Sequence, residues 1–568
     1  MGAVVSVRAL HLGEITPEVR KGYGVSPGDH PKMTTNDTHV GASTKSSSSS
    51  VVASVGQWVT SSDHKKIGRL FIGWSLVHAI EVAVIGIIFG LERMSPSSMQ
   101  IFDGDAALQL SWLFRHVLVL GLVAPLFIGI AIAVVPMQVG SKAISFPRLA
   151  QYGFWAWFFG SGLVLISLIA NGGPNGGNAD MGDLFLLGVG LLIVGLLSAS
   201  LSVATTILTS RAPGMSLDMI PAFSWSALIA SIATLLTLPV AISSVIYLYV
   251  DHTYAQNAFG GGKGIETWLG WVYSAPQTLV FVIMAFGVLA EIAPVVARVR
   301  QPLRPVVLGG IALISAATIG AVTQTNHVLD LSGTNGDKLS STVLFLLTNG
   351  LPLLGMLVAV AVAMLSFKEG KPSVNAAFAF SILGVLMILA GATGAFVGNV
   401  KDAGLQGTSF SEGITLYLAY GGVLVALGAL THWAPKLWGV VLDDKKVLGL
   451  AGLGLIGTVL SSLPLYIAGF ADQPANVVNG FEYGGPVALW NVLAAAGSAL
   501  IALVVLAYVG LLVAAVRAGA GAKDDPWDAH TLEWSIPSPA PANNFASLAT
   551  VSSSEPLLDA KPSQEVPA

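Results

Sequence analysis

The side chains of this chain that could carry out redox or metal chemistry are its histidines, because cysteine is absent. The sequence has 10 His and 0 Cys among 568 residues. The lack of thiols excludes disulfides, iron–sulfur clusters, thiolate zinc sites and a cysteine-ligated dicopper centre within this chain. Imidazole binds iron and copper well while it stays neutral in an apolar environment. Metal chemistry here would therefore depend on histidine.

Two ionisable residues stand three positions apart inside a long apolar run. His78 and Glu81 lie in the run 68–90, and residues at this spacing share one face of a helix. Ionisable groups at membrane depth are costly and usually face a bundle interior or a proton path. Two interpretations stay open for this pair: a hydrogen-bonded contact that fixes helix packing, or part of a proton or ligand path.

The composition requires a membrane to position these residues. Hydrophobic residues make up 54% of the chain and charged residues 10%, and the mean hydropathy is +0.74. A soluble domain has about 25% charged residues. The apolar runs are long and continuous, which indicates helices rather than the alternating strands of a barrel. The predicted fold class is all-α, a polytopic membrane bundle of about twelve transmembrane helices.

The chain divides into two tails and a transmembrane domain. We expect residues 1–55 to be a disordered N-terminal tail, residues 56–518 the transmembrane domain, and residues 519–568 a Pro-rich cytoplasmic tail. The polar leader that starts at Met33 makes either Met1 or Met33 the true start. The predicted spans are 68–90, 111–136, 153–171, 183–208, 222–249, 271–297, 303–323, 340–366, 373–397, 411–433, 446–470 and 486–516.

Basic residues in the short loops predict the orientation. Sixteen lysines and arginines fall on the side that holds both termini, and the other side holds four, namely Arg93, Lys263, Lys338 and Lys401. Because basic loops stay in the cytoplasm, both termini are expected to be cytoplasmic. The expected location is the bacterial plasma membrane, with the lipid bilayer as a partner and no nucleic acid.

Loop motifs carry a resemblance to a known family. The sequence S-D-H-K-K-I-G resembles the T-D-H-K-x-I-G that opens cytochrome c oxidase subunit I, a member of the heme–copper oxidase family. Further segments resemble that family's loops and ending in the same order along the chain. These segments are 62–68, 135–140, 145–149, 211–217, 433–436, 442–443 and 526–545. The resemblance implies three arcs of helices around pores that enclose two hemes and a copper in the family.

The sixth span tests the copper site that the resemblance implies. The family pattern G-H-P-E-V-Y aligns with S-A-P-Q-T-L at residues 274–279. The copper-ligating histidine is therefore replaced by Ala275, the proton-gating glutamate by Gln277, and the cross-linked tyrosine by Leu279. We expect that this span cannot bind copper as the family does.

The same comparison indicates that residues which contact heme in the family are replaced in this chain. Ile414 and Leu416 occupy the places of two heme-ligating histidines, and Ala475 and Asn476 replace a pattern with two arginines that pair with heme propionates. Losing these arginines removes charge-assisted bidentate contacts. An arginine of the first span aligns with Gly90.

Two histidines partly match the family. His116 lies in the second span, where the family has a heme ligand, but counting from Pro125 puts that ligand at Phe114. A shift of two residues rotates a helical side chain by about 200°. His116 is thus a heme-ligand candidate or a histidine paired with a polar neighbour. His327 overlays one of two adjacent copper ligands and is a metal-ligand candidate or a residue at the membrane edge.

These replacements lead to one functional hypothesis and two alternatives. We expect a cytochrome c oxidase subunit I-like respiratory membrane protein whose active site is degenerate, acting as a structural or assembly subunit beside subunit II-like and III-like chains. No cofactor is expected from the residues, which leave room for at most one heme where the family implies two hemes and a copper. The alternatives are a working oxidase with displaced ligands, reducing O2 with proton translocation, and a transporter or channel that reuses the pores.

Overall fold

The computed structural model describes residues 56–95, 101–325, 327–478, 480–482, 485–548 and 550–560. The expectations for residues 1–55 and for the start at Met1 or Met33 lie outside these residues. Within the described residues every named element is helical, and the β contacts are two isolated bridges, Leu329 with Val400 and Thr408 with Pro474. The predicted all-α class is confirmed.

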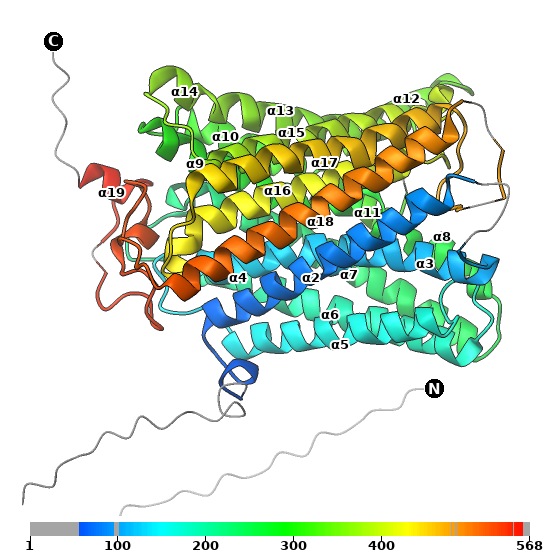
Figure 1. Ribbon diagram of the computed structural model, residues 1–568, viewed down its shortest axis with the longest axis horizontal. Coiled ribbons are helices and arrows are strands. Elements are labelled where there is room, and N and C mark those ends of the chain that lie inside the picture. Colours follow the sequence, from blue (N-terminus) through cyan, green and yellow to red (C-terminus); the bar gives the residue numbers. More distant parts are fainter. Residues whose placement is uncertain are drawn as a thin grey trace, which may run out of the picture. The chain divides into compact units, whose positions relative to one another are not determined.

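In the described part of the chain, twelve helical segments are long and apolar enough to cross a membrane, which confirms the predicted number (Figure 1). Eight consist of one helix each, and four are built from several helical pieces. The single helices are α2 (His64–Glu92), α5 (Pro147–Ile169), α6 (Ala179–Thr209), α7 (Ala222–Thr253), α15 (Ala376–Gly398), α16 (Phe410–Trp438), α17 (Asp444–Phe470) and α18 (Val487–Ala518).

The four composite spans are interrupted by a turn or by a segment of different helical winding. Two of them include a π-helical segment, the wider winding that often marks a functional position. Their pieces are α3 (Gly104–His116), η1 (Val117–Val123) and α4 (Ala124–Gln138); α8 (Gly261–Leu269), η3 (Gly270–Tyr273) and α9 (Ala275–Ala297); α10 (Arg304–Ile314) and α11 (Ala317–Val322); and α12 (Asn335–Phe345), η4 (Leu346–Gly350), α13 (Leu351–Ala363) and α14 (Leu365–Glu369).

Polar caps explain why several helices begin before the apolar run does. Asp63 precedes α2 and accepts a hydrogen bond from the Lys65 backbone N–H at 3.0 Å. Asn178, Asn375 and Asp443 cap α6, α15 and α17 in the same manner. A side-chain oxygen at this position satisfies a backbone donor that the helix itself leaves without a partner. Helices α2, α6 and α17 therefore start two to four residues before their predicted spans, whereas α15 starts at Ala376, inside the predicted span 373–397.

Small residues let neighbouring helices approach closely. A Cβ at Gly160 of α5 would lie 2.5 Å from the backbone nitrogen of Leu192 in α6, and a Cβ at Gly384 of α15 would lie 2.5 Å from the carbonyl oxygen of Gly421 in α16. Glycine at these positions brings backbones together, which is how helices associate in a bilayer that gives no hydrophobic drive between them.

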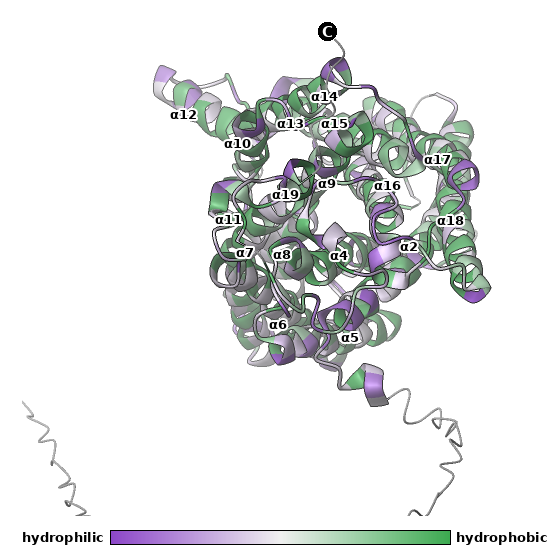
Figure 2. Ribbon diagram, turned by 90° about the vertical axis from the view of Figure 1, so that its left-hand side faces the viewer, coloured by the Kyte–Doolittle hydropathy of each residue, from purple (hydrophilic) through white to green (hydrophobic). Residues whose placement is uncertain are grey.

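Three spans form the centre of the bundle. The most apolar stretches of Gly104–Gln138 and Lys263–Ala297 are buried along their whole length, and that of Phe410–Trp438 nearly so. Figure 2 shows α4, α9 and α16 surrounded by the other spans, and the residues of these spans are largely hydrophobic. This arrangement directs the outer helices toward lipid and places the candidate site along the central spans.

The C-terminal segment packs against one end of the bundle. It contains the short helices η6 (Leu532–Ser535) and α19 (Pro556–Asp559) and lies at the end of the bundle opposite α3, α8 and α12 (Figure 1). Glu533 and Trp534 are buried there. We call this end the tail face and the opposite end the distal face. The short helices η2 (Leu217–Met219) and η5 (Lys401–Ala403) lie in loops of the tail and distal faces, respectively.

Candidate functional site

A cavity of about 510 Å³ lies between the central spans toward the distal face. Exposed Glu266 and Gln406 belong to its rim, so it opens to that face. Deeper in, the walls are aromatic and aliphatic. They include Phe89, Phe114, Leu118, Trp271, Tyr273, Ala275, Val328, Ala395, Leu405, Phe410 and Ile414.

The three positions that the sequence aligned with family ligands meet at this cavity. Ala275 begins α9, Ile414 lies in the first turns of α16, and Phe114 lies in α3, and all three line it. Asn476, which takes the place of a propionate-binding residue, lines it as well. Segments far apart in sequence thus enclose one space whose walls contain no histidine among the described lining residues.

A second cavity beside it is almost filled. Phe114 and Leu416 both line this space of about 20 Å³, together with Gly90 and Phe89. Room for one water needs roughly 10–15 Å³. Helix α18 closes this region, because a Cβ at Gly90 would lie 2.5 Å from the carbonyl oxygen of Asn491. No tetrapyrrole fits between Phe114 and Leu416 in this structure.

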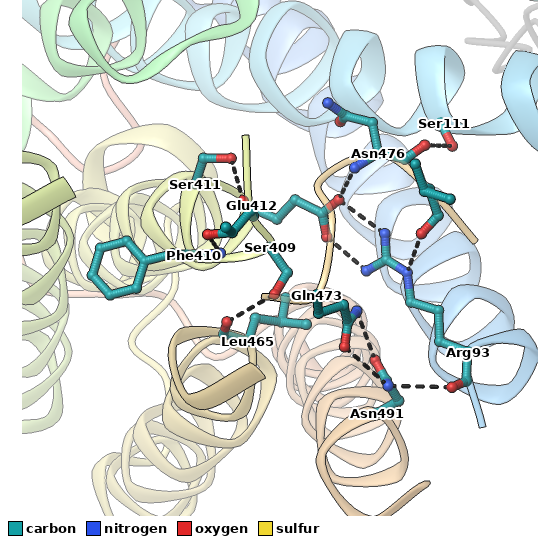
Figure 3. Close-up of polar contacts among 12 residues, drawn as sticks. Arg93, Ser111, Ser409, Phe410, Ser411, Glu412, Leu465, Gln473, Asn476 and Asn491 are labelled. Atoms are coloured by element: carbon teal, nitrogen blue, oxygen red, sulfur yellow. Dashed lines mark hydrogen bonds and ion pairs between the residues drawn. The ribbon is translucent and has the colours of Figure 1, made fainter. Parts of the chain in front are cut away.

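The ion pair of Arg93 and Glu412 closes the distal end of this region (Figure 3). The Arg93 guanidinium donates to the two Glu412 oxygens at 2.6 and 2.9 Å. Its Nε donates to the carbonyl oxygen of Val477 at 3.0 Å, and the backbone N–H of Asn476 donates to Glu412 at 2.5 Å. A side-chain carboxylate of the chain itself therefore anchors the loop where the family has propionate-binding arginines.

Paired amides extend this network toward α18. The side chains of Gln473 and Asn491 exchange hydrogen bonds at 3.3 Å, and Asn491 also donates to the Arg93 carbonyl oxygen at 3.3 Å (Figure 3). The backbone N–H of Ala475 donates to the Gly407 carbonyl oxygen at 2.8 Å. These contacts fix the loop before α18 to the ends of α2 and α16.

His116 is buried beside the cavity but is not part of its lining. Its Nδ1 shares a hydrogen bond of 3.3 Å with the Tyr273 hydroxyl, and its Nε2 has no partner. The π-helical segment η1 separates His116 from Pro125, so counting in α-helical turns does not give the direction of the ring. The hydroxyl partner corresponds to the polar-neighbour interpretation.

His78 and Glu81 form a close pair in α2. The His78 Nδ1 lies 2.8 Å from a Glu81 carboxylate oxygen, and the ring packs edge-on against Trp74 and Trp157. The His78 Nε2 is buried without a partner. A Cβ at Gly121 would lie 3.4 Å from the His78 ring, so this ring lies against the π-helical segment that follows His116.

His327 lies at the distal face among hydroxyl groups. Its Nε2 contacts the Thr323 hydroxyl at 2.8 Å and the Thr325 hydroxyl at 3.4 Å. Partial burial lowers the pKa of His327. The adjacent Asn326 lies outside the described residues.

Gln277 and Leu279 are buried inside α9. Gln277 is fully buried, and neither its side-chain oxygen nor its nitrogen has a partner. Buried polar groups normally have hydrogen-bond partners, and each exception calls for an explanation such as an ordered water or a ligand. Leu279 is buried and packs in the hydrophobic core.

The residues around the cavity that the structure describes lack the ligands for the cofactors that the resemblance implies. Within the described part of the chain, no three His, Asp or Glu side chains gather as a metal site. The position that the sequence aligns with the family's copper imidazole is Ala275, and the positions that it aligns with heme ligands are Phe114, Ile414 and Leu416. These side chains have no atom that ligates iron or copper. The described residues therefore do not fit the family's copper or its histidine-ligated hemes.

Sequence reasoning missed the Arg93–Glu412 pair. Both residues lie at ends of apolar runs, and this placement was the only available signal. Opposite charges at the ends of spans could pair in many ways. Only the packing of α2 beside α18 and near α16 selects the pair of Arg93 with Glu412. Arg115 was likewise counted within a span, whereas it pairs with Glu266 at 2.9 Å near the distal face.

The fold and the central cavity define a polytopic α-helical membrane protein with a potential ligand chamber enclosed by its inner spans. Comparison with known families makes this more specific. The family Cytochrome C and Quinol oxidase polypeptide I matches residues 66–501, and the chain belongs to this family. The resemblance seen in the loop motifs is thus confirmed.

Individual relatives cover most of the chain. It is 27% identical over 534 residues to the putative cytochrome c oxidase subunit 1-beta of Streptomyces avermitilis, a match that spans 88% of this chain and 91% of the relative. It is also 27% identical over 524 residues to cytochrome c oxidase subunit 1 of Bacillus subtilis, spanning 88% and 82% of the two chains. The heme-copper oxidase subunit I+III of Aeropyrum pernix is 27% identical over 519 residues, which are 87% of this chain and 62% of that relative. The chain is a cytochrome c oxidase subunit I-like integral membrane protein of respiratory type.

Proposed function

We propose that this subunit I-like chain no longer reduces oxygen and acts as a structural or assembly subunit of a respiratory membrane complex. The observation that carries the proposal is the cavity wall at Ala275 and Ile414, where the family has ligating histidines and this chain has hydrocarbon side chains. Oxygen reduction by this family requires metal centres, and alanine and isoleucine supply no ligand atom. The helices around the cavity are retained, but the side chains that would ligate the metals for oxygen reduction are not.

The packed tail face supports a docking role. Gln138 of α4 donates to Glu533 at 3.0 Å, and Lys436 of α16 donates to the carbonyl oxygen of Asp524 at 2.8 Å. Loops that resemble the family's loops thus form a defined surface. The partners we propose are subunit II-like and III-like chains of an oxidase-like complex. The name of the Aeropyrum pernix relative joins subunits I and III in one protein.

We further propose that the tail face is cytoplasmic and that the membrane is the bacterial plasma membrane. Sixteen of the loop lysines and arginines lie on the side of the tail face. The distal side has five, namely Arg93, Arg115, Lys263, Lys338 and Lys401. Basic residues favour the cytoplasmic side. Accessibility of a cysteine introduced at Lys523 and of one at Lys263, in a chain that has no other cysteine, distinguishes the two orientations in intact cells.

A visible spectrum of the purified protein tests the principal proposal. The chain, extracted in mild detergent with its native partners, is measured reduced minus oxidised, and its copper is quantified by mass spectrometry. We expect no stoichiometric heme bands and no stoichiometric copper, while subunit II-like or III-like chains co-purify. Two hemes per chain together with oxygen consumption would overturn the proposal.

A single-heme electron carrier is the second candidate, and one observation favours it. The Nε2 atoms of His78 and His116 are both buried without partners, and imidazole nitrogens in that state can ligate iron. This candidate predicts one heme per chain with a low-spin spectrum that disappears in His116→Ala. A heme-free spectrum in the parent protein rejects it.

A further inference from the structure

The large distal cavity has a size and a lining that suit a small organic molecule. Its volume of about 510 Å³ falls within the roughly 300–1,000 Å³ of small-molecule sites, which are mostly apolar with a few placed polar groups. The aligned family positions on its wall, Ala275 and Ile414, add hydrocarbon surface. The wall therefore favours an occupant held by contact rather than by ligation.

Aromatic side chains from four different spans converge on this space. Phe89 comes from α2, Phe114 from α3, Trp271 from η3 and Phe410 from α16, and all line the cavity. Aromatic rings favour offset-stacked and edge-to-face contacts with other rings. This concentration of rings on several sides favours a flat aromatic occupant over a flexible aliphatic chain.

The charges on the wall are already neutralised by the protein. The charged lining residues are Arg115, Glu266 and Glu412. Arg115 and Glu266 bind each other through two contacts of 3.1 and 2.9 Å, and Glu412 is held by Arg93. An ion that entered would lose its hydration without gaining a counter-charge, which is costly in an apolar site. The occupant should therefore be neutral.

Polar groups on the wall can orient such a molecule. The Tyr273 hydroxyl is joined to His116 Nδ1 at 3.3 Å, and that imidazole lies behind the wall rather than in it. The amides of Gln324 and Asn399 line the cavity nearer the distal face. A hydroxyl or carbonyl group on the occupant could hydrogen-bond with these groups while its ring contacts the aromatic side chains.

We propose that this cavity binds a neutral aromatic amphiphile that enters from the distal face and stacks among the wall aromatics. The proposal rests on the proposed function, because a heme in the same space would leave no room for such a ligand. It assigns the cavity a role in ligand binding that needs no metal.

Photolabelling of the full chain in lipid nanodiscs tests the proposal. Benzophenone is the neutral aromatic probe, 4-benzoylbenzoate is the same photophore with a negative charge, and labelled residues are mapped by mass spectrometry. We expect benzophenone to label peptides that contain Trp271–Ala275 and Phe410–Ile414, and an excess of 2-naphthol to suppress this labelling selectively. 4-Benzoylbenzoate should not label these peptides.

Two matched variants separate the cavity from the lipid surface. Ala275→Trp fills the cavity, and Ala499→Trp adds the same side chain to an exposed position of α18. We expect loss of cavity labelling in A275W and unchanged labelling in A499W. Labels confined to lipid-facing peptides, or equal labelling by the neutral and anionic probes, would overturn the inference. Competition by 2-naphthol in the parent chain supplies the same test if A275W does not fold.

Heme content of the same sample distinguishes the two proposals. If cavity labelling is absent and a stoichiometric Soret band is present, the proposed function has failed. If both labelling and heme are absent, only the ligand inference has failed.

Discussion

The carboxylate of Glu412 in α16 accepts hydrogen bonds from both terminal guanidinium nitrogens of Arg93, the residue that follows α2, at 2.6 and 2.9 Å. The Arg93 and Glu412 side chains are 3% and 13% exposed. This pair joins residues 319 positions apart in sequence. One oxygen of Glu412, Oε1, also accepts a hydrogen bond from the backbone N–H of Asn476. It closes the distal end of the region where the family binds heme.

Removing one charge of this pair should destabilise the protein strongly. Glu412→Gln removes the carboxylate charge that the buried Arg93 guanidinium contacts at 2.6 and 2.9 Å, and breaking a buried pair in this way costs about 3 kcal/mol or more. Glu266→Gln is the control, because the Glu266 side chain is 48% exposed in its pair with Arg115 and such a pair contributes about 1 kcal/mol or less. Unfolding in detergent measures the stability of both variants. An equal loss of stability in the two variants would contradict the prediction that the buried pair matters more.

Restoring histidines should not restore a heme between α3 and α16. The double variant Phe114→His with Leu416→His places two imidazoles at the aligned positions, but the space between them is about 20 Å³. We expect no bis-histidine low-spin spectrum after expression with added heme precursor. A stoichiometric low-spin signal would show that the region opens more readily than its packing indicates.

Gly90 should tolerate no side chain. In Gly90→Ala the new Cβ meets the Asn491 carbonyl oxygen at 2.5 Å and the Ala495 Cβ at 2.6 Å, and overpacking of this kind costs about 1–3 kcal/mol. Gly73→Ala, in the same helix, meets no atom within 4 Å. Thermal unfolding should show a loss of stability for G90A but not for G73A. If G73A lost as much, a general effect on α2 would be responsible.

The packing of the C-terminal segment against the bundle should depend on Asn544. Its side-chain nitrogen donates to the Ser141 carbonyl oxygen at 2.8 Å, and its oxygen accepts from Lys65 Nζ at 3.1 Å. Asn544→Ala removes both hydrogen bonds, while Lys65 Nζ keeps its contacts with Asp63 and with the Ala542 carbonyl oxygen. Losing a partner in a buried polar contact costs about 1–3 kcal/mol. Limited proteolysis should then cleave the tail faster. Asn543→Ala, at the exposed neighbouring position, should leave the cleavage rate unchanged.

Buried Glu533 should make stability fall as the pH rises. Burial raises the pKa of Glu533 above its usual value, so the folded state keeps its proton at pH values where the unfolded chain has lost it. The unfolded chain then binds fewer protons, and the stability decreases from about pH 4.5 upward until the folded group has also ionised. Glu533→Gln should flatten this dependence in unfolding measured from pH 5 to 8. The exposed Glu369→Gln on the same face should retain it.

Much of the fold could be predicted from local sequence. Each span is an apolar run of sufficient length, and the bilayer requires such runs to be helical, so all twelve were predicted. Their ends were less accurate, because caps such as Asp63 add a polar turn that hydropathy does not register. The loop motifs between residues 62 and 545 also predicted the family, since short segments in a fixed order are specific without any knowledge of packing.

The candidate site needed tertiary structure. Alignment predicted that Ala275, Ile414 and Leu416 replace ligands, but only the packing of α3, α9 and α16 showed that the first two line a large cavity and the third a nearly filled one. The environment of His116 depends on a π-helical segment between it and Pro125. That winding is set by contacts with neighbouring helices, which no local pattern records.

The sequence by itself determined that this chain crosses a membrane, about how many times it does so, and that it has ten histidines and no cysteine. These are properties of residue types and their order. Tertiary structure alone decided that Arg93 meets Glu412, that the Tyr273 hydroxyl meets His116, and that one cavity stays open while its neighbour closes. Such contacts join residues far apart in the chain, and the close approach of whole helices selects them.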